Sequence, residues 1–293
     1  MMRPVKILLQ STIPSTQDDW SISRFSLLSK FLREQQDERD NALFEVTSRD
    51  RDALGAPDRV LSTLDQSDFD EMWLFAVDTG EGLTSEDCEA ISRFRRSGRG
   101  LMVTRDHMDL GSSICTLAGV GAAHHFHSRN IDPNALREPD DPYTTYISWP
   151  NFHSGANGDY QEIHVNAPAH PVLANPASPT GVIRYLPAHP HEGAVSAPAN
   201  QEARVIAFGY SKATGRPFNI AVAFESQHGY GRAIAQSTFH HFADYNWDTR
   251  KGAPTFVDEP PGDGIHRNAE ALADTHRYVL NVALWLGGKD GQN

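Results

Sequence analysis

The chain has 293 residues, of which 39% are hydrophobic and 22% are charged. This length and composition suit a globular protein with a large buried core. The formal net charge of −12 argues against nucleic acids and anionic membranes as partners. No apolar run approaches the roughly 18 residues of a membrane helix. We therefore expect a cytoplasmic protein without a membrane anchor.

The two cysteines, Cys88 and Cys115, are too far apart for a CxxC motif. Both lie in predicted helices, where a buried free thiol is the usual state. The sequence thus indicates neither a disulfide framework nor a cysteine metal site.

The first half of the chain alternates predicted strands and helices. The sequence predicts strands at 5–9, 43–47, 72–77 and 101–103, helices at 21–35 and 84–96, and a helical turn at 60–64. Thr84 and Asp87 form a capping-box pattern, and Gly98 ends that helix. The charged run 49–52 is typical of a solvated loop. This alternation predicts a parallel, doubly wound sheet.

The second half is richer in predicted strands. We expect them at 122–128, 162–165, 182–186, 203–209, 219–225 and 232–237, before a final helix at 269–286. Residues 129–160 form an irregular excursion rich in Pro, Asp and Asn, and long loops of this kind are often functional. No shift in composition marks a second domain, so a single domain over 1–293 is predicted.

Ionisable side chains follow the predicted central strand at once. Arg105, Asp106 and His107 come directly after it, and Gly111 to Ser113 are expected to open a helix. Ligands bind outside the carboxyl ends of strands in open α/β sheets. An Asp beside a His can orient a general base, and Arg105 can hold a carboxylate or phosphate. The alternative is a purely structural cap on the strand.

Five segments occur in an order that resembles the ThuA-like (trehalose-utilisation) family, which is related to class I glutamine amidotransferases. They span nearly the whole chain and read GRGLMVTRDH, AAHHFHS, EIHVNAPAHPVL, NIAVAFESQHGYGRAIAQSTFHH and RYVLNVALWLGG. The resemblance implies a flavodoxin-like, three-layer α/β sandwich around a mostly parallel sheet. It also implies a strand-end histidine near Arg105 to His107, a functional histidine at His240, and an acidic group near the pocket at Glu192.

The sequence departs from this family in two places. The glycine of the family's Gly-His pair is replaced by Phe239, and no cysteine stands at the turn where an amidotransferase keeps its nucleophile. Cys115 lies about two helical turns further on. Because the thiolate must sit at that turn beside its base, glutaminase activity is excluded.

Histidines gather in three short segments. In the extended HHFH segment, His125 and His127 share a face and could bind one divalent metal, with a third ligand from His107, His191, Glu192 or His240. They could equally be surface or core histidines.

The segments PAHPHEG and STFHHFADYNWD carry the remaining candidates. Glu192 could act as an acid or base beside His189 and His191, or the loop could be structural. The aromatic residues around His240 and His241 could form a wall for a sugar ring, or a hydrophobic lid.

We therefore expect acid–base chemistry on a small polar, sugar-like substrate, as a hydrolase, lyase or isomerase. The expected catalytic residues are Asp106, His107, Glu192 and His240. The expected substrate-binding residues are Arg105, Trp20, His189, His191, His241, Tyr245 and Trp247, and the expected metal ligands are His125 and His127. The alternative is a non-catalytic ligand-binding or assembly domain, and a homo-oligomer fits either role. A hydrolase using Ser112 or Ser113 is disfavoured because no G-x-S-x-G elbow is present.

Overall fold

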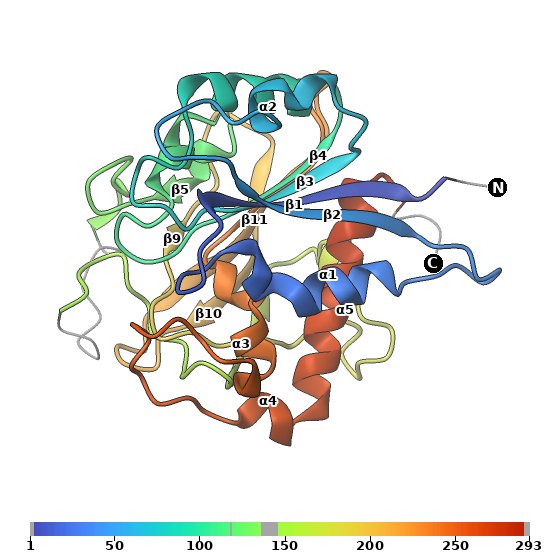
Figure 1. Cartoon of the computed structure of the whole chain (residues 1–293). Helices are drawn as coiled ribbons and strands as arrows, with labels where there is room; N and C mark the ends of the chain where they lie inside the picture. Colours follow the sequence, from blue (N-terminus) through green and yellow to red (C-terminus); the bar gives the residue numbers. More distant parts are fainter. Residues whose placement is uncertain (1–2, 118, 136–145, 290–293) are drawn as a thin grey trace.

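A computed structural model describes residues 3–117, 119–135 and 146–289 and is built around one eight-stranded sheet (Figure 1). Neighbouring strands follow the order β2-β1-β3-β4-β12-β11-β10-β7. Their bounds, in that order, are Phe44–Arg51, Val5–Pro14, Glu71–Phe75, Gly100–Thr104, Ala233–Gln236, Pro217–Phe224, Ala203–Tyr210 and His164–Val165. The strands from β2 to β12 run parallel, and the remaining pairings are antiparallel. This is the flavodoxin-like strand order with an antiparallel extension, so the predicted fold class is confirmed.

Helices cover both faces of the sheet. Helix α2 (Ser85–Arg96) packs on one face, while α1 (Ser26–Arg33) and α5 (Ala269–Leu286) pack on the other (Figure 1). Every residue of β3 and β4 is buried, as expected for strands covered on both sides. The capping box of Thr84 and Asp87 starts α2, and α5 has the predicted bounds.

Short strands and helical turns lie in the connections that contain the site residues. Two small sheets form from β5 (His124–His125) with β9 (Ala194–Val195), and from β6 (Tyr160–Glu162) with β8 (Tyr185–Pro187). The other short elements are η1 (Ile22–Phe25), η2 (Leu61–Gln66), η3 (Ser112–Thr116), η4 (Gly121–Ala123), η6 (Pro171–Leu173), η7 (Phe239–His241), α3 (Asp244–Trp247), η8 (Thr249–Lys251) and α4 (Gly264–Arg267).

Three local predictions are wrong. The strand expected at 122–128 is only the two residues of β5, preceded by the 3₁₀ turn η4. The run 49–52 is not a solvated loop, because β2 continues to Arg51 and its arginines are paired. Arg49 lies 2.7 Å from Asp58, and the buried Arg51 lies 3.4 Å from Asp87 of α2. The helix expected after Gly111 is only the short 3₁₀ turn η3, which ends where Leu117 becomes extended.

The excursion at 129–160 ends beside β8, where Tyr160 of β6 pairs with Pro187 in the small two-stranded sheet. Within it, residues 136–145 lie outside the described part of the chain. Phe152 exchanges backbone hydrogen bonds of 2.9 Å with Glu192, so the excursion is attached to the loop after β8. The single domain over 1–293 stays a prediction. None of the described helices has the length and apolarity needed to cross a membrane.

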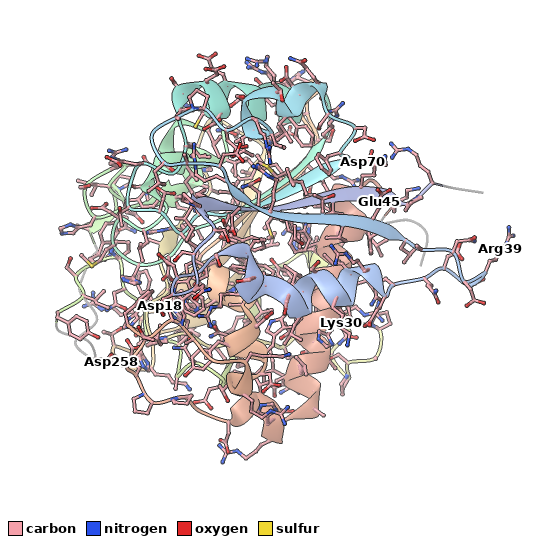
Figure 2. All side chains as sticks on the ribbon, in the orientation of Figure 1. Asp18, Lys30, Arg39, Glu45, Asp70 and Asp258 are labelled. Atoms are coloured by element: carbon pink, nitrogen blue, oxygen red, sulfur yellow. The ribbon has the colours of Figure 1, made fainter. Side chains whose placement is uncertain are left out.

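The parallel strands all begin on one side of the molecule and end on the opposite side. In Figure 2, Glu45 and Asp70 lie on the side where β2 and β3 begin, and Asp18 and Asp258 lie on the opposite side. The side chains of the candidate site follow the carboxyl ends of β4 and β12.

Candidate functional site

Asp106 and His240 come together because their strands are neighbours. Strands β4 and β12 are parallel and pair Thr104 with Gln236. Two residues beyond β4, the Asp106 carboxylate accepts a 3.0 Å hydrogen bond from the Thr238 hydroxyl. The His240 Nε2 atom lies 3.8 Å from Asp106 Oδ2. The sheet therefore places the carboxylate and the imidazole together.

His189 enters the cluster from the loop after β8. Its Nδ1 atom lies 3.6 Å from Asp106 Oδ1, and its ring stacks on that of His240 with 3.5 Å between centroids. Two contacts hold the loop in place. Asn246 donates to the Ala188 carbonyl at 3.0 Å, and the Ser154 amide donates to the His189 carbonyl at 3.0 Å.

Asp106, His189 and His240 form a group that could hold a metal ion. One ligand atom from each lies within 4.8 Å of the other two. Ligand atoms at about 2.1 Å from a tetrahedral metal are about 3.4 Å apart. His189 Nδ1 lies 3.6 Å from Asp106 Oδ1, and His240 Nε2 lies 3.8 Å from the other carboxylate oxygen, Oδ2. A carboxylate and two imidazoles are a common ligand set for zinc and for ferrous iron.

Hydrogen bonds orient the His240 ring so that it could act as a metal ligand. The Asn246 side-chain amide donates to the Asn157 side chain and the Ala188 carbonyl, so its oxygen faces His240. His240 Nδ1 donates to that oxygen at 2.8 Å, which leaves the Nε2 lone pair directed at Asp106. Burial lowers the pKa of His240 to about 4, so its imidazole is neutral near pH 7.

The charge states of His189 and Asp106 also suit a metal site. Burial, with the nearby histidines, lowers the pKa of His189 well below its usual value. Burial alone would raise the pKa of Asp106, but His107 beside it and the other imidazoles lower it. The cluster thus holds an anionic carboxylate and two neutral imidazoles. The His191 amide donates to His189 Nδ1 at 3.2 Å, a contact that a metal at this atom would replace.

His107 is the most accessible imidazole around Asp106. Its side chain is 18% exposed, compared with 4% or less for Asp106, His189 and His240. His107 Nδ1 donates to Asp106 Oδ2 at 3.0 Å, so its Nε2 is left to act as a base. Its ring centroid lies 5.1 Å from that of His191.

Two members of the site were not predicted from the sequence. His191 Nε2 donates to Glu259 at 2.6 Å, and this contact lowers the pKa of Glu259. Glu259 comes from the polar loop before α4, where no sequence pattern marked it. Asn246 lies in the STFHHFADYNWD segment, where a polar amide six residues after His240 was a signal that could have been used.

Glu192 and His241 belong to a separate buried network. Glu192 is fully buried and accepts hydrogen bonds from Ser154, Gln161 and Ser237. His241 Nε2 lies 3.4 Å from Glu192 Oε2. Gln236 donates to His241 Nδ1 at 2.7 Å, and Tyr278 of α5 donates to Gln236 at 2.7 Å. These contacts assign Glu192 and His241 a supporting position rather than a direct contact with substrate.

The aromatic residues expected to bind substrate are divided between two places. Trp20 is close to the cluster, with its ring centroid 4.6 Å from that of His240. Tyr245 is buried, and burial raises its pKa with a further contribution from Glu259. Trp247 instead donates to the His241 carbonyl at 2.9 Å and packs on His276 of α5. Trp247 is therefore part of the core.

Arg105 does not have the position expected of a substrate-binding residue. It is fully buried, donates to the His125 and Met108 carbonyls, and lies with its guanidinium carbon 4.2 Å from the Phe126 ring centroid. These contacts hold the loop after β4 against the segment around β5.

His125 and His127 do not form the expected metal site. His125 Nδ1 donates to the Asn130 carbonyl at 2.7 Å, and the Ser196 hydroxyl lies 2.6 Å from Nε2. Both ring nitrogens are therefore used. His127 is exposed, and neither residue belongs to the metal-competent group found among the described residues. The correction moves the candidate metal from the HHFH segment to Asp106, His189 and His240.

No family profile and no curated protein matches the sequence. Among solved structures, a protein described as ThuA-like from Bacteroides uniformis is similar at 12% identity and a TM-score of 0.46, over 94% of this chain and 91% of that one. One from Parabacteroides merdae has 15% identity and a TM-score of 0.46, over 89% and 96%. The acivicin-bound glutaminase domain of Trypanosoma brucei CTPS has 14% identity and a TM-score of 0.47, over 95% and 93%. No activity is carried over from them.

Proposed function

We propose that this protein is an enzyme that performs acid–base chemistry on a small polar substrate, with a divalent metal ion held by Asp106, His189 and His240. One observation carries the proposal. Three segments far apart in sequence bring an anionic carboxylate and two neutral imidazoles to one place at the ends of β4 and β12. Such a group is a strong candidate for function because desolvating it is costly.

His107 is the proposed base. Asp106 holds its Nδ1 proton, so Nε2 can take a proton from a hydroxyl or a water molecule at the accessible side of the cluster. A divalent cation would act as a Lewis acid toward an oxygen of the same substrate. His107, once it has taken this proton, can return it in the second half of the reaction, and His191, held by Glu259, lies beside it with 5.1 Å between ring centroids.

A sugar-like substrate is part of the proposal. Hydroxyl groups suit a site of carboxylate, amide and imidazole groups, and the indole of Trp20 beside His240 offers an apolar face for CH groups. Hydrolysis, elimination and isomerisation of such a substrate can each use the base and the Lewis acid proposed here.

The metal is tested by elemental analysis of the purified chain and by titration with zinc, manganese and ferrous iron. We expect one equivalent per chain in the wild type, and loss of that equivalent in Asp106→Asn and His240→Gln. His127→Gln is the matched control, because His127 is exposed and outside the cluster. Absence of binding in the wild type, or equal binding in all four proteins, would contradict the metal assignment.

The base is tested separately by turnover on a panel of sugars, sugar lactones and sugar phosphates. We expect His107→Gln to lower kcat while the metal content stays at one equivalent.

A non-catalytic binding role is the second candidate, and the low exposure of Asp106, His189 and His240 favours it. In that case a sugar would bind at the cluster with no turnover, and His107→Gln would change affinity alone.

A further inference from the structure

A cavity lies near the amino-terminal ends of the central strands, on the opposite side of the sheet from the strand ends that carry the histidine cluster. Its volume is about 280 Å³, and its lining includes the end of α2, the end of β11 and the turn that leads into β12. These are the amino-terminal ends of β4 and β12, whereas Asp106 and His240 follow the carboxyl ends. The cavity is therefore independent of the proposed catalytic site.

Arg95, in the last turn of α2, is the buried cation of this cavity. Its side chain lies between two aromatic residues, with the guanidinium carbon 5.2 Å from the Phe224 ring centroid and 5.5 Å from that of Tyr230. The residue is only 5% exposed. Burial lowers the pKa of Arg95 to about 10, so the guanidinium still carries its charge at neutral pH.

The guanidinium has unused hydrogen-bonding capacity. Arg95 Nε donates to the Gly231 carbonyl at 3.0 Å. Its two terminal nitrogens donate to no described residue, and no described carboxylate forms an ion pair with Arg95. A buried guanidinium without a counter-ion is costly, and an anion that accepts two parallel hydrogen bonds would offset that cost.

Gly119 keeps one side of the guanidinium open. Its φ is +79°, and a Cβ at this position would lie 2.9 Å from Arg95 Nη1 and 2.5 Å from the Gln201 side-chain oxygen. Any larger residue would fill the space in front of that nitrogen. The glycine thus leaves room for an anion to approach the guanidinium.

Two acidic side chains supply negative charge at the same cavity. Glu202 and Glu225 also line the cavity, and both are exposed. Neither forms an ion pair with Arg95 in the described part of the chain, and the Glu225 carboxylate lies 3.2 Å from His170 Nε2. The cavity therefore presents a buried positive group and a negative rim, together with the side-chain amides of Asn200, Gln201 and Gln227.

We propose that this cavity binds a small zwitterion of the amino-acid type, with its carboxylate on Arg95 and its ammonium toward Glu202 and Glu225. The volume lies just below the roughly 300–1,000 Å³ of ordinary small-molecule sites, which suits a molecule of this size. A phosphate would be a poorer ligand, because its second negative charge would face the acidic rim.

The proposal is tested by titration calorimetry on the full chain with glycine, L-leucine and L-phenylalanine. Each is compared with its deaminated acid and its decarboxylated amine; for L-leucine these are 4-methylpentanoate and 3-methylbutylamine. We expect at least one amino acid to bind at millimolar concentration or below. Its deaminated acid should bind about 10-fold more weakly, and the amine should not bind detectably.

Three variants locate the binding. Arg95→Met keeps an unbranched side chain between the aromatic rings and should abolish binding of the amino acid. The double variant Glu202→Gln/Glu225→Gln should reduce the amino acid to the affinity of the deaminated acid. Arg99→Met is the matched control, because Arg99 lies over Phe94 and does not line the cavity.

Three results would overturn the proposal. They are no binding of any of the three amino acids to the wild type, equal binding of the amine, or unchanged binding in Arg95→Met. If Arg95→Met does not fold, the comparison of amino acid, acid and amine on the wild type, together with the double variant, still decides the outcome.

Discussion

Two segments of this chain contain a pair of histidines separated by one residue, and the two pairs have different surroundings in the structure. In the first, His125 is buried with both ring nitrogens hydrogen-bonded, and His127 is exposed. In the second, His189 stacks on His240 beside Asp106, and His191 contacts Glu259. In the second segment His189 belongs to the metal-competent group but its neighbour His191 does not, and in the first segment neither histidine belongs to it.

The difference lies in the side chains and backbone groups that contact each segment. His189 comes after β8 and faces the ends of β4 and β12, where a carboxylate and a third imidazole are already in place. His125 meets a backbone carbonyl and a serine. A pair of imidazoles can bind a metal tightly only when a third ligand is held at the right distance. Ligand spacing within one segment is thus a weak predictor of a site assembled from several segments.

The largest expected effect is on the free energy of unfolding, when Glu192, which follows His191 in the second segment, is replaced. Replacing Glu192 with leucine removes the buried acceptor that Ser154, Gln161 and Ser237 share, and Ser237 then has no other acceptor among the described residues. We expect the free energy of unfolding to fall by about 3–5 kcal/mol in urea titrations. In the control Glu259→Leu, the contact with His191 is the one lost within the described part of the chain, and we expect a loss of about 1 kcal/mol or less. Equal losses in the two variants would contradict a supporting role for Glu192.

A smaller effect is expected on metal affinity, when a hydrogen-bond partner of His240 or of His125 is removed. Asn246→Leu removes the oxygen that orients His240, and we expect metal affinity to fall by about 10–100-fold. A competition titration with a chromogenic chelator measures this change. Ser196→Ala removes a partner of His125 in the first segment and should leave the affinity unchanged. The assignment of His240 as a ligand fails if Asn246→Leu binds metal as tightly as the wild type.

The smallest effect concerns pH and the first segment. His124 is fully buried, neither of its ring nitrogens has a hydrogen-bond partner among the described residues, and burial lowers its pKa well below the usual value. Below about pH 6.5 the unfolded chain takes up a proton at His124 that the folded chain does not, so stability falls as pH decreases. His124→Leu should reduce this loss by up to about 2 kcal/mol at pH 5.

Thermal or urea unfolding of the metal-free chain at pH 7 and pH 5 measures this difference. His127→Leu is the control and should retain the pH dependence of the wild type, because His127 is exposed. An identical pH dependence in His124→Leu and the wild type would show that His124 is protonated in the folded state.

The sequence by itself determined the central elements of this protein and part of its site. The apolar run of β4, the capping box of α2 and the periodicity of α5 are local signals, and the structure bears them out. The order of strands and helices was enough for the parallel sheet. It also placed Asp106 and His107 after β4, because ionisable residues directly following a buried strand must lie at its end.

Only the tertiary structure decided which other residues join Asp106. That β12 lies beside β4, and that the loop after β8 reaches the same place, depends on pairings between segments far apart in the chain. It also decided the burial of Arg105 and the removal of Glu192 and His241 into a separate network. The physical reason is that a metal site or a buried hydrogen-bond network depends on distances between side chains. Composition and spacing constrain these distances only within one segment.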